Sequence, residues 1–145
     1  SVSTLESMAY NFLSTDCIVC AVMDARCSQV YNALFEIKNG VVTRLCDDRA
    51  LSLNDLKNEL LSVDGRIIIA GDGTDITSKY IGNEIKNAES APVNLKYQRA
   101  SSTALVAFKM INNGKTVSAQ ELMPVYLRLP QAQRELNKKL GGRTK

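Results

Sequence analysis

The sequence contains no histidine and no tryptophan, and only three of its 145 residues are proline. Without histidine the chain cannot form a Ser-His-Asp triad, a Cys-His nucleophile pair, a histidine-ligated zinc site or an imidazole proton shuttle. No apolar run approaches the ~18 residues that span a membrane, and no signal-peptide pattern is present. We therefore expect a cytoplasmic protein that does not contact a membrane.

The remaining composition is that of an ordinary globular chain, with 45% hydrophobic and 23% charged residues. We expect one domain over residues 1–145, with a core that needs no disulfide or metal. The first residue is Ser1 rather than methionine, and Ser3-x-x-Glu6 has the pattern of a helix capping box. The chain is therefore expected to begin inside a structure, as a fragment of a longer protein.

The positive charge is concentrated at the C-terminal end. Residues 128–145 carry six basic side chains against one acid, whereas the whole chain has a net charge of +3. Pro130, Leu136 and Leu140 predict a terminal basic helix and tail over residues 130–145. Two interpretations remain open: the tail contacts RNA phosphates, or it is a solvated helix end whose cations suit the helix dipole.

The four cysteines lie in the first third of the chain, within apolar segments. Cys17-x-x-Cys20 has the spacing of a redox or zinc motif, but residues three apart in a strand point to opposite faces. No second such pair completes a site. We expect neither a metal site nor a redox site.

Hydrophobic spacing predicts a helix, three antiparallel strands, a second helix and a buried strand. Asn39-Gly40 between two β-rich runs is a strong hairpin signal, and Ser52-x-x-Asp55 caps the second helix. These elements are predicted over residues 4–14, 17–24, 29–38, 41–46, 53–61 and 66–70.

The second half of the chain predicts a helix to about Asn87 with Ile76, Tyr80 and Ile85 inward, and then a short strand over residues 93–97. Ser101-Ser102 is expected to cap a buried central helix, which is followed by a turn at 118–121 and an extended segment at 125–127. This order predicts an α/β fold, a mixed sheet with helices on both faces. It resembles the ribonuclease-H-like pattern that forms each half of actin-like proteins.

The buried strand runs directly into Gly71, Asp72, Gly73 and Thr74. A glycine-rich turn before a helix can present backbone N–H groups to a phosphate, which makes ATP or ADP the candidate cofactor. The turn is neither a dinucleotide fingerprint nor a P-loop, and glycine serves tight turns equally well. Both interpretations remain open, and the expectation is that the chain has no cofactor.

No catalytic residue is predicted. No imidazole is available as a base, and Asp24, Asp72 and Asp75 have no carboxylate partner at a recognisable spacing. Asp24 and Arg26 stand at a hairpin corner, where they form either a structural pair or a binding element.

Five short segments together resemble the C-terminal portion of the TsaB (YeaZ) family, and they cover essentially the whole chain. The N-terminal half of that family has no counterpart here. The segments are Val2-Ser-Thr-Leu-Glu6, Asp24-Ala-Arg26, Gln29-Val-Tyr31, Ala70-Gly-Asp-Gly73 and Pro124-Val-Tyr-Leu-Arg128.

The resemblance implies a non-catalytic partner of the transferase TsaD, which acts with the ATPase TsaE to make threonylcarbamoyladenosine (t6A) in tRNA. The implied associations are with TsaD and TsaE, with a second copy of the chain and, indirectly, with tRNA. In this family, partner contacts use mainly the N-terminal half. Gly71–Gly73 would stand at a nucleotide cleft that is degenerate in this family. The alternatives are a nucleotide-binding or phosphotransferase enzyme of the actin-like superfamily and, from the family's older glycoprotease-like name, a peptidase.

Overall fold

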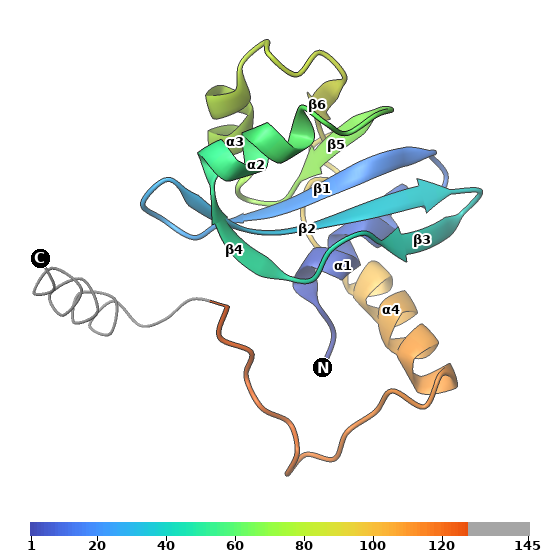
Figure 1. The fold of residues 1–145 in the computed structure, drawn as a ribbon. Coiled ribbons are helices and arrows are strands. Elements are labelled where there is room, and N and C mark those ends of the chain that lie inside the picture. Colours follow the sequence, from blue (N-terminus) through green and yellow to red (C-terminus); the bar gives the residue numbers. More distant parts are fainter. Residues whose placement is uncertain (128–145) are drawn as a thin grey trace, which may run out of the picture.

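A six-stranded mixed sheet forms the centre of the computed structural model, which describes residues 1–127 (Figure 1). The strand order is β3-β2-β1-β5-β6. β3 pairs with the C-terminal half of β2, and β4 pairs with its N-terminal half. β2 is antiparallel to β1, whereas β5 is parallel to β1 and β6 to β5. The strands are β1 (Cys17–Asp24), β2 (Gln29–Lys38), β3 (Val41–Arg44), β4 (Arg49–Ser52), β5 (Ile67–Ala70) and β6 (Ala88–Ser90).

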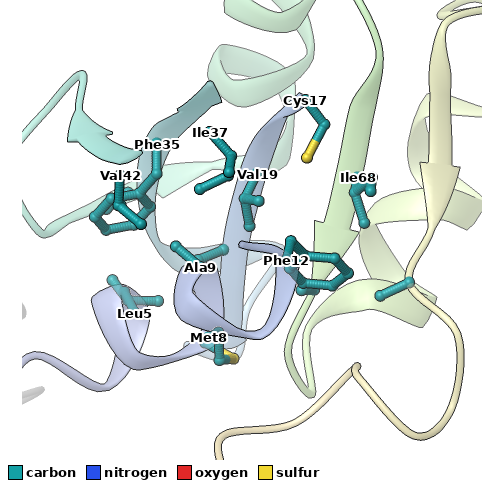
Figure 2. Close-up of a cluster of buried hydrophobic side chains, with 14 residues drawn as sticks. Leu5, Met8, Ala9, Phe12, Cys17, Val19, Phe35, Ile37, Val42 and Ile68 are labelled. Atoms are coloured by element: carbon teal, nitrogen blue, oxygen red, sulfur yellow. The ribbon is translucent and has the colours of Figure 1, made fainter. Parts of the chain in front are cut away.

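The central strand β1 divides the core into two clusters, because its side chains alternate between the two faces of the sheet. Cys17, Val19 and Ala21 pack with α1 (Thr4–Ala9) and the 3₁₀ turn η1 (Tyr10–Phe12), as Figure 2 shows for the labelled residues. On the other face, β1 packs with α2 (Leu53–Leu60) and with Ile81 of α3 (Thr74–Ile81). The predicted mixed sheet with helices on both faces is confirmed.

Local signals placed the first half of the chain correctly. The Ser3 hydroxyl accepts the Glu6 N–H at 3.2 Å, and the Ser52 hydroxyl accepts the Asp55 N–H at 3.0 Å. Asn39 and Gly40 both have positive φ, 52° and 74°, as the predicted hairpin turn requires. The first helix, the three-strand meander, the second helix and the buried strand are all confirmed.

Three predictions for the middle of the chain are wrong. The helix expected to reach Asn87 ends at Ile81, because Gly82 leaves the helix with a φ of 55°. Tyr80 was expected to point inward but is 43% exposed. No strand forms over residues 93–97; residues 88–90 pair with β5 instead, so the last strand lies earlier in the chain.

The strand β4 was missed because its sequence, Arg49 to Ser52, does not alternate clearly between apolar and polar residues. β2 has ten residues, and β3 pairs only with its C-terminal half. The N-terminal half of β2 therefore pairs with β4, from Gln29↔Ser52 to Asn32↔Arg49.

The helix α4 (Ala100–Asn112) is not the buried central helix that its composition predicted. Its N-cap is Arg99, with no side-chain cap, rather than Ser101-Ser102. Only Ser102 and Val106 are buried, since α1 already covers this face of the sheet and α4 packs beside α1 and η1. The predicted terminal helix at 130–145 lies outside the described residues. Within residues 1–127, no helix is long and apolar enough to cross a bilayer.

A buried polar network joins β2, β4 and α2. The Asn32 side chain is fully buried; its amide donates to the Ala21 carbonyl at 3.0 Å, and its Oδ1 accepts from Arg49 Nη2 at 3.0 Å. The same Arg49 nitrogen bonds Glu59 Oε2 at 2.6 Å. Arg49 therefore satisfies a buried acceptor that no water can reach.

We expect Arg49→Met to lower the free energy of unfolding by about 1–3 kcal/mol, because the Asn32 carbonyl loses its donor inside the core. Arg66→Met is the matched control, since Arg66 also bonds a glutamate, Glu89, but both side chains are about half exposed. That control should cost at most about 1 kcal/mol. Urea unfolding curves measure both values, and equal losses would contradict the role given to Arg49.

The turn between β5 and α3 passes directly over the end of β1. A Cβ placed on Gly71 would lie 1.9 Å from the Val22 carbonyl oxygen, and the φ of Gly71 is +118°. Gly73 is also tight, with a Cβ position 3.1 Å from the Met23 carbonyl carbon. Glycine is thus required at residue 71 by close backbone packing.

We expect Gly71→Ala to cost more than about 2 kcal/mol of unfolding free energy, because the turn must move away from β1. Gly65→Ala is the control: Gly65 also has a positive φ, +88°, but a Cβ there meets nothing within 4 Å. Its cost should be only the ~1–2 kcal/mol of a left-handed backbone. Thermal and urea unfolding test the difference, and similar losses at both positions would rule out the packing role.

Candidate functional site

Two turns meet where the parallel strands β1 and β5 end. One is the β1–β2 hairpin with Asp24 and Arg26, and the other is the Gly71–Thr74 turn. The Asp24 backbone N–H donates to Asp72 Oδ1 at 3.2 Å, and the Gly73 N–H donates to the Val22 carbonyl at 3.3 Å. The structure therefore brings together the two groups of candidate residues, which lie almost fifty positions apart in the sequence.

The hairpin turn has an unusual backbone, with Arg26, Cys27 and Ser28 at φ values of 63°, 54° and 55°. Three consecutive left-handed residues other than glycine are costly. Asp24 stabilises them, since its Oδ1 accepts the Arg26 N–H at 2.7 Å and its Oδ2 lies 3.2 Å from Arg26 Nη1. Asp24 and Arg26 thus form a structural pair, while the Arg26 side chain remains 85% exposed and able to contact a partner.

The amide groups of the glycine-rich turn are largely used within the protein. The Gly71 N–H donates to the Lys96 carbonyl at 2.7 Å, and the Thr74 N–H donates to the Gly71 carbonyl at 3.2 Å. The Thr74 side chain is fully buried, and its hydroxyl donates to the same Gly71 carbonyl at 2.7 Å. A phosphate-binding turn needs free N–H groups directed outward, so this one fits a phosphate poorly.

The charges around the turn also oppose an anion. Asp72 lies on the turn, and Asp75 occupies the first turn of α3, where its carboxylate bonds Lys96 Nζ at 2.6 Å. The hydrogen bond that Lys96 donates to Asp75 raises the pKa of Lys96 above its usual value, so the ammonium group is charged and committed to this pair. A bound phosphate would face the Asp72 carboxylate with the neighbouring cation already paired.

Cys17 and Cys20 are not placed as a redox or metal-binding pair. Cys17 and Cys20 lie in the two separate core clusters, on opposite faces of β1. Burial raises the pKa of the Cys20 thiol to about 12, so it is protonated at neutral pH and is not a nucleophile. Within residues 1–127, no three cysteine, aspartate or glutamate side chains are placed to hold a metal ion.

A pocket that the sequence did not predict lies next to the β1–β2 hairpin. It has a volume of about 310 Å³ and lies between the start of α1, the adjoining ends of β1 and β2, and the extended segment 125–127. Three of the segments quoted for the family resemblance meet there, through Thr4 and Leu5, Tyr31, and Val125 and Tyr126. They are distant in sequence, and only the fold brings them together.

Arg44 fixes one wall of that pocket. Its guanidinium group bonds Asp48 Oδ1 at 2.5 Å and Glu6 Oε2 at 2.9 Å, and it lies 4.7 Å from the centre of the Phe35 ring. The Ser3 hydroxyl donates to the other Asp48 oxygen at 2.6 Å. Ser3 and Glu6 of the first segment are therefore used to anchor α1 to the sheet.

Sequence reasoning missed Lys96 and Asp48, which both support these sites. Lys96 holds the glycine turn through its carbonyl and its ammonium group, and Asp48 connects Ser3 with Arg44. Neither residue belongs to a sequence motif, and neither lies at a characteristic spacing from another functional residue. Their roles follow from contacts across the fold, for which the sequence carries no local signal.

Comparison with known proteins finds one curated relative and solved structures that are similar to this chain. No family model matches it. The curated protein "tRNA threonylcarbamoyladenosine biosynthesis protein TsaB" of Bacillus subtilis (strain 168) is 26% identical over 133 residues, which cover 92% of this chain and 57% of that protein. The chain therefore spans little more than half the length of this relative.

Two solved structures from Pseudomonas aeruginosa share the fold. One, described as an uncharacterized protein with similarity to peptidase YeaZ, has a TM-score of 0.64 and 20% identity, covering 88% of this chain and 57% of that one. The other, YeaZ, has a TM-score of 0.65 and 19% identity, covering 87% and 57%. The TsaB match along most of the chain and the fold shared with the YeaZ structures show that the chain is similar to part of the TsaB (YeaZ) proteins.

Proposed function

We propose that the chain is a non-catalytic part of the machinery that makes t6A in tRNA, where it supports the transferase TsaD. The observation that carries the proposal is the sequence match to the t6A biosynthesis protein TsaB over 92% of the chain. Such a role requires a stable folded surface rather than a reactive centre.

The candidate site supports a structural role. Asp24 holds the Arg26 turn, Asp72 accepts a backbone N–H, and Thr74 is buried against Gly71. General acid–base catalysis needs a titratable group within reach of a substrate proton, and each of these groups is already committed to a backbone partner. Because the sequence also has no histidine, no nucleophile is paired with an imidazole base.

The proposed partners are TsaD and TsaE, with tRNA contacted indirectly and a homodimer as a further association. The proposed location is the cytoplasm, where tRNA is modified. The chain matches just over half of TsaB, so part of the partner-binding surface is expected to lie in the portion of the family without a counterpart here.

Nucleotide binding is the second candidate. The observation in its favour is that Gly73, the N-cap of α3, offers no side-chain oxygen to the N–H groups of the first helical turn. The acidic surroundings and the occupied amides of the turn count against it. A peptidase, the activity named in the description of one structural relative, would need a nucleophile and base that the candidate site does not supply.

We expect the chain to restore t6A to tRNA when it replaces the matching residues of B. subtilis TsaB in cells depleted of that protein. Mass spectrometry of tRNA nucleosides measures the modification. Failure of a well-expressed, folded graft to restore t6A would overturn the proposed process.

The Asp72→Asn variant of the same graft tests the proposal that the chain is non-catalytic. Asparagine keeps the Oδ1 acceptor for the Asp24 N–H and removes the charge, so t6A levels should be unchanged. If Asp72 were a general acid or base, this change would reduce the rate by about 100-fold or more. Asp24→Asn serves as a second variant, because it retains an acceptor for the Arg26 N–H.

Calorimetric titration of the chain with ATP and ADP separates the two candidates directly. We expect no saturable binding at millimolar nucleotide, because the Gly71 and Thr74 N–H groups already have acceptors. Saturable binding that Asp72→Lys strengthens would instead favour the nucleotide-binding alternative, since this change replaces a repulsive charge by an attractive one.

A further inference from the structure

One side of α4 exposes apolar side chains that the rest of the described chain leaves uncovered. Leu105, Phe108 and Ile111 are 49%, 64% and 59% exposed. Their spacing of three residues places them along one side of the helix, and Ala104 beside them is also exposed. Three large apolar residues in a row on one helix face are typical of a contact surface.

The opposite side of α4 is firmly held, so the exposed row does not result from a detached helix. Val106 is buried against the core, and the Ser102 hydroxyl donates to Asn11 Oδ1 at 2.6 Å. The Asn11 amide in turn donates to the Leu95 and Tyr97 carbonyls at 2.9 Å. Figure 1 shows α4 beside α1 with its C-terminal end directed away from the sheet.

The charged residues in the stretch of chain that contains this row have one sign only. Arg99 precedes the helix, Lys109 lies on it with its ammonium group 5.8 Å from the centre of the Tyr10 ring, and Lys115 follows it. No aspartate or glutamate occurs between Glu89 and Glu121. The segment that carries the apolar row therefore has cations before, within and after the helix, and no acid.

This charge pattern distinguishes between the segments that could cover the exposed side of α4. Residues 128–145 carry six cations and one acid, and a second copy of α4 would bring the same three cations to the contact. Both would place like charges around an apolar centre, which disfavours pairing. An amphipathic helix of another protein, with acidic residues beside its apolar face, would instead bring a charge opposite to that of these cations.

We propose that Leu105, Phe108 and Ile111 form a docking surface for such an acidic amphipathic helix of a partner protein. The two helices pack side by side, with Phe108 in the groove between apolar residues of the partner. Arg99, Lys109 and Lys115 face the partner's carboxylates at the rim. The surface does not depend on the glycine turn or on the proposed non-catalytic role.

Two synthetic helical peptides test the surface on the full chain. They share one leucine and alanine face, and they differ only in flanking residues, glutamate in one and lysine in the other. NMR of isotope-labelled protein should show the glutamate peptide binding about tenfold more tightly, as expected from a few exposed ion pairs, with shifts at Leu105, Phe108 and Ile111. The preference should weaken at 0.5 M salt.

Two serine variants provide the matched control. Phe108→Ser should abolish the shifts, whereas Val93→Ser, at a loop residue that is 84% exposed, should leave them unchanged. Lys115→Glu should remove most of the preference for the glutamate peptide, with circular dichroism confirming that every variant is folded. Equal binding of both peptides, or shifts away from α4, would overturn the proposal. So would a dimer in sedimentation analysis that Phe108→Ser dissociates, since a second copy would then cover the surface.

Discussion

The burial of β1 on both faces is the constraint on which the rest of the structure depends. Its side chains alternate between two core clusters, so each face of the sheet must be covered by helices. β1 also pairs with β2 on one side and β5 on the other, which places the β1–β2 hairpin and the β5–α3 turn at the same end of the sheet. The candidate site is a consequence of this arrangement.

At that end of the sheet, many backbone and side-chain groups are hydrogen-bonded to each other. Residues of the two turns that resemble a ligand site in sequence therefore stabilise the fold. Gly71 is required because the turn passes against the Val22 carbonyl, and Asp72 and Asp24 accept backbone N–H groups. A turn packed this closely has few donors left for a ligand. The exposed groups near it, chiefly the Arg26 side chain, suit contacts with another macromolecule better than enclosure of a small one.

Predictions from short sequence patterns were correct where an element depends only on residues adjacent in the sequence. The Ser3 and Ser52 caps and the Asn39-Gly40 hairpin were correct, because each depends on a few adjacent residues. The helix end near Ile81, the strand β4 and the position of β6 were not, because each depends on pairing or packing with a distant segment. In the candidate site, Asp24 and Gly71 could be found by motif, but Lys96 could not.

By itself the sequence determined which segments are rich in apolar residues, where the first hairpin turns and which histidine-dependent chemistries are excluded, because these follow from residue types and their spacing. Only the tertiary structure decided what covers each apolar side chain and whether each polar group keeps a free donor or acceptor. α4 shows the difference: its composition indicated a buried helix, yet α1 already occupies that face of the sheet and leaves Leu105, Phe108 and Ile111 exposed. Burial is a property of the whole fold, so an apolar pattern states what must be covered but not by what.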